Sequence, residues 1–508
     1  MYGKVIGIAL IGVTGTPVAV EAHVGRGLPS LSLAGLPGAS VQDARERVRP
    51  AVESVGLEWP LRRVVINLSP VNLRKDGPGL DLPIAMGVLA ATGQVPGAAA
   101  GRYAFAGELS LRGELMPTPG VLTVALAAAR HGLHGVVVPA SNAEEASLVE
   151  GLEVIGAPTL AEVVGVLRGV WRPESPEARG APPAAATTVD LADVRGQAVA
   201  RRALEVAAAG GHNVFMVGPP GSGKTMLARR FATILPSLTR AEALEVTQLH
   251  SVAGLLGGRC LVPERPFRAP HHSVSMAGLL GGGSGGLMRP GEASLAHRGV
   301  LFLDEFNEFR RDAIEGLRQP LEDGRVVVTR AHGAVEFPAR FTLVAAANPC
   351  PCGHEGDPVR ACECAPQRAQ AYRQKLSGPL LDRVDIRLAV PRLSPAELLT
   401  QEPGEPSAPV RDRVEAARER QRGRLGDRFR CNAEVPGHVA RREVELTPDA
   451  DRLLDDAARR LGLTGRGFDR ALKVARTVAD LEAAGRVEGV HLAEALSYRV
   501  GQPEAAHV

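Results

Sequence analysis

The chain has 508 residues, of which 45% are hydrophobic and 23% are charged, and 59 Lys and Arg against 56 Asp and Glu leave a net charge of +3. This length allows about three domains of roughly 150 residues each, and the composition excludes a disulfide-stabilised miniprotein and a disordered chain. The small net charge excludes a basic field over the whole protein, so any nucleic-acid site has to be local. Because no run of about 18 apolar residues occurs, we expect a cytoplasmic protein without a targeting segment or a membrane partner.

Two stretches rich in proline and alanine, residues 172–188 and 401–409, lack hydrophobic periodicity and are typical of linkers. The part before the first stretch mixes strand-like alternation with helical spacing, which predicts an α/β or α+β layer. Helical spacing of apolar residues near the C-terminus predicts helices at 450–461, 468–484 and 492–500. We therefore predict a first domain at 1–171, a linker at 172–188, a second domain at 189–394 and a helical domain at 395–508.

A glycine-rich loop in the second domain directly follows a short apolar strand at 214–217 and opens a helix that runs through 227–235. Such a loop turns backbone N–H groups toward phosphate oxygens, and the following helix adds its positive N-terminal end. Lys224 would reach the terminal phosphates of ATP, and Thr225 would hold Mg²⁺. The residues expected to bind the nucleotide are Gly218, Pro219, Pro220, Gly221, Ser222, Gly223, Lys224 and Thr225.

A second apolar strand ends in two carboxylates, Asp304 and Glu305. In P-loop ATPases a strand of this kind delivers one carboxylate to the metal and one group to the attacking water. An apolar strand that ends in Asp-Glu is common by itself, and the preceding glycine loop is what makes this one informative. We therefore predict that Asp304 helps to bind Mg²⁺ and that Glu305 is the general base.

Two further polar residues follow apolar segments of the second domain. Asn348 ends a third apolar strand, at 341–347, where its amide would position the attacking water. Arg383 lies among apolar residues at 376–385. An arginine in such a place is most often a salt-bridge residue, whereas in a ring ATPase it completes the neighbouring subunit's site. Both residues are candidate catalytic groups.

Five segments carry distinctive motifs: Phe-Arg-Ala-Pro-His-His-Ser at 267–273, three glycines at 281–283, Pro-Gly-Glu-Ala-Ser-Leu-Ala-His-Arg-Gly at 290–299, Pro-Leu-Glu-Asp-Gly at 320–324 and Ser-Gly-Pro-Leu-Leu-Asp-Arg at 377–383. Together they resemble the YifB/ComM family of magnesium-chelatase-like AAA+ ATPases. The resemblance implies a multidomain α/β fold, in which an α+β domain like that of Lon protease, of the ribosomal S5 type, precedes a three-layer P-loop AAA+ core and a helical lid. It also implies a hexameric homo-oligomeric ring and a DNA helicase activity in branch migration during recombination or natural transformation.

The same resemblance places a sensor for the γ-phosphate in the lid, at Arg466 or Arg470, which sequence does not separate. The first domain departs from the Lon pattern at both catalytic positions. Gly79 stands where the protease has its nucleophilic serine, and Val124 stands where it has the activating lysine. Without a nucleophile and a base, we predict that this domain is a binding or assembly platform and not a protease.

β-forming residues at 324–337 predict a hairpin. In related ring motors such an insertion faces the pore, where Arg330 and His332 would contact DNA phosphates without regard to sequence, although a plain surface hairpin would carry the same residues. The glycine-rich segment 277–289 is a second pore-loop candidate. The arginine-rich segment 411–424 is as compatible with a solvated helix as with a DNA-binding face.

Two groups of candidate metal ligands remain. Four of the six cysteines form two Cys-x-Cys pairs, namely Cys350, Cys352, Cys362 and Cys364. Four thiolates suit tetrahedral Zn²⁺, and free thiols are the alternative. His271 and His272 are adjacent on a loop and lack the spacing of a helical ligand pair, so we expect hydrogen-bonding roles and assign them no function.

Two functions from different classes stay open. The chain is either a ring ATPase that moves on single-stranded or branched DNA, or a chelatase-like or chaperone-like motor that remodels a protein partner. Nothing in the sequence decides which polymer is threaded, or the number of subunits in the ring.

Overall fold

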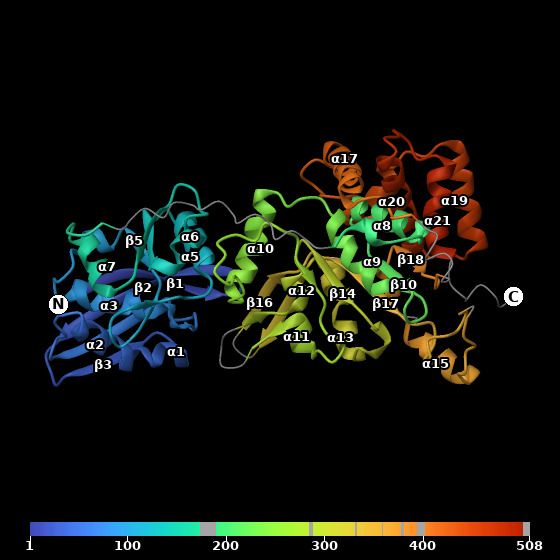
Figure 1. Cartoon of the computed structure of the whole chain (residues 1–508). Coiled ribbons are helices and arrows are strands. Elements are labelled where there is room, and N and C mark those ends of the chain that lie inside the picture. Colours follow the sequence, from blue (N-terminus) through green and yellow to red (C-terminus); the bar gives the residue numbers. More distant parts are fainter. Residues whose placement is uncertain are drawn as a thin grey trace.

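The computed structural model describes residues 1–172, 189–283, 288–330, 333–357, 359–376, 380–393 and 402–500. Most of the predicted 172–188 linker, part of the glycine-rich segment and His332 lie outside these ranges. The chain forms two sheets in succession, and a group of helices follows the second sheet at the C-terminal end (Figure 1).

The first sheet has seven strands in the order β3-β4-β2-β1-β5-β8-β9. Its strands are β1 (Tyr2–Ile11), β2 (Thr14–Gly25), β3 (Ser30–Ala34), β4 (Arg63–Ser69), β5 (Tyr103–Phe105), β8 (Gly135–Pro139) and β9 (Glu153–Ala157). β1 and β2 form a long antiparallel ribbon, whereas β5, β8 and β9 continue the sheet in parallel. This mixture of strand directions agrees with the expected α/β or α+β layer.

Helices on this sheet bury the apolar faces of its strands. α3 (Asp81–Ala91) packs on β1 and β2 and is buried along nearly its whole length. It approaches closely because β1 has a glycine at the contact, where a Cβ on Gly3 would lie 2.4 Å from the backbone nitrogen of Ala91. The other elements are α1 (Ala39–Gln42), α2 (Ala44–Ser54), α4 (Gly97–Ala100), α5 (Val121–Arg130), α6 (Ala143–Ala146), α7 (Leu160–Leu167) and the short strands β6 (Glu108–Leu109) and β7 (Leu115–Met116).

The second sheet is wholly parallel, with five strands in the order β11-β14-β17-β10-β18. The strands are β10 (Val214–Val217), β11 (Phe267–Arg268), β14 (Val300–Leu303), β17 (Thr342–Ala347) and β18 (Ile386–Ala389). Its central strands are continuous apolar runs, because both faces are covered. The three strands predicted from apolar runs, before the glycine loop, before Asp304 and before Asn348, are confirmed.

Helices and a hairpin surround this sheet. They are α8 (Ala198–Gly210), α9 (Lys224–Phe231), α10 (Arg240–Val252), α11 (Met276–Leu280), α12 (Glu292–Leu295), α13 (Arg311–Gly316), α14 (Arg318–Asp323) and α15 (Pro366–Leu376). β12 (Gly281–Gly282) pairs with β13 (Arg289–Pro290). The predicted hairpin is present as β15 (Arg325–Arg330) and β16 (Gly333–Pro338), paired in antiparallel register.

The C-terminal part is helical, as predicted, and consists of α17 (Ser407–Leu425), α18 (Gly437–Glu443), α19 (Pro448–Arg460), α20 (Gly465–Leu481) and α21 (Gly489–Val500). These helices share one hydrophobic core with α8 and the second sheet. The arginines of α17 bind neighbouring elements: Arg413 pairs with Glu205, Arg424 pairs with Asp480, and Arg418 donates to the carbonyl of Ala208. Three of the arginines thus attach the helix to the core, whereas Arg422 is exposed and pairs with Glu419 as in a solvated helix, and the DNA-binding alternative stays untested.

The first domain contacts the second through the turn between β1 and β2 and through α5. The Gln248 side chain on α10 donates to the carbonyl of Val13 at 2.7 Å, and the Gly120 N–H donates to the Ser251 hydroxyl at 2.9 Å. The same turn meets the hairpin, where a Cβ on Gly12 would lie 2.5 Å from Val335. Figure 1 shows α10 between the two parts. The first domain therefore packs against the middle of the hairpin's second strand.

Candidate functional site

The predicted phosphate loop connects β10 to α9 at the carboxyl edge of the parallel sheet. Gly221 and Gly223 have φ of +78° and +93°, which only glycine adopts without strain. Gly218 has no space for a side chain, since a Cβ there would lie 2.1 Å from the carbonyl of Val390. The loop therefore needs its glycines for conformation and for close packing, and it leads into the positive end of α9.

Lys224 is buried at the start of α9. Its ammonium donates to the carbonyls of Gly218 at 2.6 Å and Pro219 at 3.0 Å, and to the Asn348 amide oxygen at 3.3 Å. Burial lowers the pKa of Lys224, while the charge of Asp304 acts in the opposite direction. These hydrogen bonds go to neutral oxygens, so the positive charge is available to a phosphate group.

Thr225 and Asp304 lie in direct contact. The Thr225 hydroxyl donates to the Asp304 carboxylate at 2.6 Å, and the other carboxylate oxygen accepts the Glu305 N–H at 2.9 Å. Adjacent ligands of octahedral Mg²⁺ lie about 2.9 Å apart. The two oxygens therefore fit neighbouring positions around one magnesium ion with little movement.

Glu305 has a left-handed backbone, with φ of +51°, which is uncommon and strained for a residue with a side chain. Its carboxylate is 58% exposed and lies 3.3 Å from the Nδ1 atom of His272. The His272 ring in turn lies 4.0 Å, between centroids, from the ring of His271. Sequence analysis assigned no function to His272, although it follows β11, the neighbour of β14 in the sheet. Strand order was the missing signal.

Asn348 follows β17, the strand between β14 and β10. Because the carboxyl ends of parallel strands meet at one edge, its amide reaches Lys224. The structure thus brings Lys224, Thr225, Asp304 and Asn348 together through the contacts above, with Glu305 next to Asp304.

Arg383, Arg466 and Arg470 lie at the opposite, amino edge of the sheet. Arg383 pairs with Glu322, and an Arg466 nitrogen lies 3.7 Å from the same carboxylate. β18 runs parallel to β10, so this edge is separated from the phosphate loop by the length of a four-residue strand, about 13 Å. Arg466 and Arg470 therefore lie away from the phosphate loop of their own chain, and the contact of either with a γ-phosphate stays a prediction.

A buried polar network holds this amino edge. Arg470 pairs with Asp385 at 3.0 Å, and His212 lies 3.2 Å from that carboxylate. Burial opposes ionisation of Asp385, but the His212 hydrogen bond and the nearby cations prevail and lower its pKa. Arg383, Arg470 and Asp385 line a cavity of about 550 Å³.

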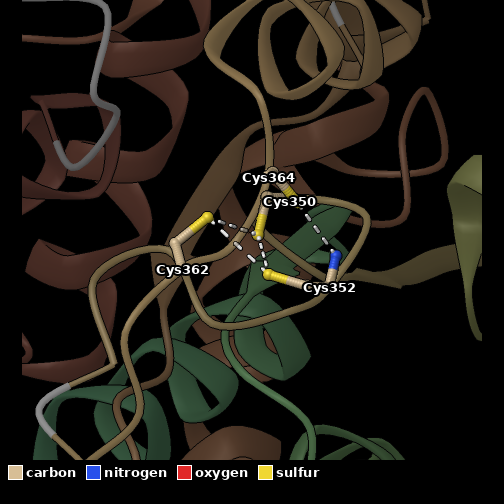
Figure 2. A group of neighbouring side chains, drawn as sticks. All are labelled: Cys350, Cys352, Cys362 and Cys364. Atoms are coloured by element: carbon tan, nitrogen blue, oxygen red, sulfur yellow. Dashed lines mark hydrogen bonds between the residues drawn. The ribbon is translucent and has the colours of Figure 1, made fainter.

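The four clustered cysteines lie beyond Asn348, and their sulfur atoms are all within 4.8 Å of one another. The Cys350 and Cys352 sulfurs are 3.3 Å apart, and each lies 3.6 Å from that of Cys362 (Figure 2). Backbone N–H groups of His354 and Glu363 lower the pKa of Cys352 to about 6. The structure therefore gathers the two Cys-x-Cys pairs into one site.

The remaining predicted residues lie apart from this site. Arg330 ends β15 and His332 falls outside the described residues, so the DNA contact stays a prediction. In the first domain Gly79 lies in a short turn whose carbonyl accepts the Gly107 N–H, and Val124 is buried in α5. A Cβ on Gly79 would meet no atom within 4 Å, so a serine would fit there. Within the described ranges, no helix has the length and apolar character needed to cross a membrane.

Three family models match the chain. "Magnesium chelatase, subunit ChlI" matches residues 190–398, "Subunit ChlI of Mg-chelatase" matches residues 20–142, and "Magnesium chelatase, subunit ChlI C-terminal" matches residues 404–499. The matches therefore include the second sheet, the C-terminal helices and the part of the first sheet between β1 and β9.

Several relatives are similar over almost their whole length. An uncharacterised protein of Mycobacterium tuberculosis is 48% identical over 505 residues, which is 98% of each chain. The competence protein ComM of Haemophilus influenzae and the uncharacterised protein YifB of Escherichia coli are each 42% identical, over 97% of this chain and 96% of theirs. A Lon protease of Geobacter metallireducens is 26% identical over 212 residues, which is 39% of this chain and 25% of the protease.

Proposed function

We propose, from the premise that the chain belongs to the YifB/ComM family of magnesium-chelatase-like AAA+ ATPases, that it is a ring-forming ATPase that couples ATP hydrolysis to movement along DNA. The observation that carries the ATPase part is the joint placement of Lys224, Thr225 and Asp304 at one sheet edge, with Glu305 and Asn348 beside them. ATP is the substrate and Mg²⁺ the cofactor in this proposal.

Each residue at this edge has one task. Lys224 exchanges its carbonyl partners for the terminal phosphates, and the backbone of the glycine loop surrounds the phosphate oxygens. Thr225 and Asp304 would hold Mg²⁺, which neutralises phosphate charge. Glu305 accepts the proton of the attacking water, and Asn348 orients that water through its amide. His272 keeps the Glu305 carboxylate in place.

The ring part of the proposal rests on the separation of Arg383 from the phosphate loop of its own chain. An arginine finger stabilises charge on the transferred phosphoryl group and can be supplied in trans. If Arg383 serves the ATP bound to a neighbouring subunit, Arg466 is next to it, since both arginines lie near Glu322. We propose a homo-oligomeric ring, hexameric as the family resemblance implies, in which every ATP site is shared by two subunits.

For the action on DNA, we propose that the protein is a helicase for branch migration in recombination or natural transformation. The name of the similar competence protein supports this direction. The hairpin of β15 and β16 would present Arg330 and His332 to DNA phosphates. Replacing Arg330 and His332 with alanine is then expected to abolish stimulation by DNA while the ATPase rate without DNA is unchanged. Unchanged DNA unwinding by this double variant would overturn the assignment.

A second function is favoured by the three matches to magnesium chelatase subunit models. In it the same ring remodels a protein partner, and DNA has no effect on ATP hydrolysis. The deciding measurement is the ATPase rate with and without forked and four-way-junction DNA, with Lys224→Ala as the blank. Strong stimulation that weakens as salt rises supports the DNA motor, and a high rate indifferent to every DNA supports the protein remodeller.

Two further parts of the proposal concern sites outside the ATP edge. The first domain is a binding or assembly platform and not a protease, because Gly79 and Val124 supply neither a nucleophile nor a base. ATP-stimulated peptide hydrolysis by the pure protein would contradict this. The four clustered cysteines bind Zn²⁺ as a structural metal.

A further inference from the structure

We propose that the zinc ion bound by the four clustered cysteines holds the turn at Gly353 against the phosphate loop, so that the nucleotide site is complete only in the metal-loaded protein. The inference rests on the proposed ATP site and adds a metal to its wall. The four cysteines would then support the nucleotide site, a role that the family comparisons do not assign to them.

The sulfur positions fit zinc and do not fit disulfides. With a Zn–S bond of about 2.3 Å, the sulfurs of a tetrahedral site lie about 3.8 Å apart. The measured separations of 3.3 and 3.6 Å among Cys350, Cys352 and Cys362 are close to that value. They are much longer than the roughly 2.05 Å of an S–S bond, and all six cysteines are free. Figure 2 shows the sulfurs turned toward one another.

Backbone N–H groups donate to two of the four sulfurs. The Cys352 N–H donates to the Cys364 sulfur at 3.3 Å, and the Glu355 N–H donates to the Cys350 sulfur at 3.3 Å. Hydrogen bonds of this kind around the ligands stabilise metal thiolates. Between the two cysteine pairs Val359 is 63% exposed, and the contacts are polar, such as the pairs of His354 with Asp357 and of Arg373 with Glu355. A metal would take the place of a hydrophobic core here.

The turn that follows Cys352 lies against the proposed ATP site. Gly353 follows Cys352 in a turn with φ of +82°, and a Cβ there would lie 2.6 Å from the Pro220 ring and 3.9 Å from the Asn348 side chain. Cys350 itself comes two residues after Asn348. The first ligand pair is therefore fixed between the phosphate loop and the residue that contacts Lys224.

The second ligand pair connects the cluster to the other side of the site. α15 begins just after Cys364, and its Arg373 pairs with Glu355 at 2.7 Å. α15 also packs against the short helix Phe306–Glu308, which follows Glu305. Four thiolates around one metal would thus tie together the segments that carry Asn348 and Glu305, and rigid support of this kind sets how well a site binds and reacts.

The test uses two separate variants of the full chain, Cys362→Ser and Cys364→Ser. These two cysteines are chosen because they lie further along the chain from Gly353 than Cys350 and Cys352 do. Cys260→Ser is the matched control. Zinc is measured by plasma mass spectrometry, folding by circular dichroism, and affinity by fluorescence of a labelled ADP with Mg²⁺. We expect about one zinc per chain in the wild type and in Cys260→Ser, and loss of zinc with about tenfold weaker nucleotide binding in the other two. Chelation of the wild type followed by zinc addition should remove and restore binding.

Gly353→Ala tests the contact between Gly353 and Pro220 without removing a zinc ligand. It leaves the cysteines in place but adds a methyl group at a positive φ, against Pro220. We expect zinc to be retained and nucleotide binding to weaken. Absence of zinc from freshly purified wild type would overturn the metal site, and equal nucleotide affinity with and without zinc would overturn the coupling. Zinc-dependent binding in a protein that hydrolyses no ATP would support this inference and reject the proposed ATPase.

Discussion

The two edges of the parallel sheet carry opposite chemistry. At the carboxyl edge the buried Lys224 contacts the Asn348 amide, and the Thr225 hydroxyl contacts the carboxylate of Asp304, which precedes Glu305. At the amino edge Arg383, Arg466 and Arg470 are paired with Glu322 and Asp385 around an open cavity. The first edge carries groups that can bind the nucleotide and activate water, whereas Arg383, the candidate arginine finger, lies at the other edge. This separation supports the proposal that one chain carries two halves of a site, which would meet between neighbouring copies of the chain.

The largest expected effect comes from Arg383→Ala, which should lower the ATPase rate by about 10³-fold while leaving nucleotide affinity nearly unchanged. The physical reason is that the arginine stabilises charge only in the transition state. Steady-state ATPase assays and labelled-ADP binding check it. Mixing Arg383→Ala with Lys224→Ala should restore part of the activity, because some interfaces then join two intact edges. No recovery in mixed rings would break the idea of a shared site.

Glu305→Gln tests the carboxyl edge alone. Removal of the base should lower kcat by roughly 10²- to 10³-fold, while ATP still binds because Lys224, Thr225 and Asp304 are unchanged. Single-turnover hydrolysis with equilibrium binding separates the two. A variant that hydrolyses at the wild-type rate would remove Glu305 from the mechanism.

Asp385→Asn tests whether the ion pair of Asp385 with Arg470 stabilises the amino edge of the sheet. Because the folded state lowers the pKa of Asp385, the ionised carboxylate contributes stability above its unfolded pKa of about 3.9, and this is lost as pH falls through the lower folded value. The variant should lose about 3 kcal/mol at pH 7, since Arg470 keeps a buried charge without its partner. Denaturant unfolding at several pH values should show the difference from wild type shrinking in acid. A pH-independent difference would contradict the ion pair.

The smallest expected effect is that of His272→Ala. Loss of the imidazole beside Glu305 should lower kcat by about tenfold without changing nucleotide affinity, because the base is no longer held in position. His271→Ala is the neighbouring control, since its ring nitrogen bonds to Ser273 and not to Glu305. Equal losses in both variants would point to disruption of the loop.

Local sequence patterns were enough to predict the features that depend on residues close together along the chain. The strand at Val214–Val217, the glycine loop and the start of α9 at Lys224 follow from spacing and residue type. The same holds for the carboxylates after β14, the hairpin and the C-terminal helices. Each is set by short-range geometry, where period, glycine conformation and helix ends act within a few residues. The sequence also allowed the proposal that the four cysteines form one group, but it did not indicate that this group lies beside the phosphate loop.

Tertiary structure decided the relations between segments. The order β11-β14-β17-β10 brings His272 to Glu305 and Asn348 to Lys224. Strand order depends on packing across the whole domain, and no window of sequence contains it. For the same reason Arg424 of α17 is attached to the core, Gly353 rests on the phosphate loop, and Arg466 and Arg470 lie at the edge away from Lys224. The sequence by itself determined which groups the protein has for ATP, and only the packing of its sheet and helices decided which of them meet.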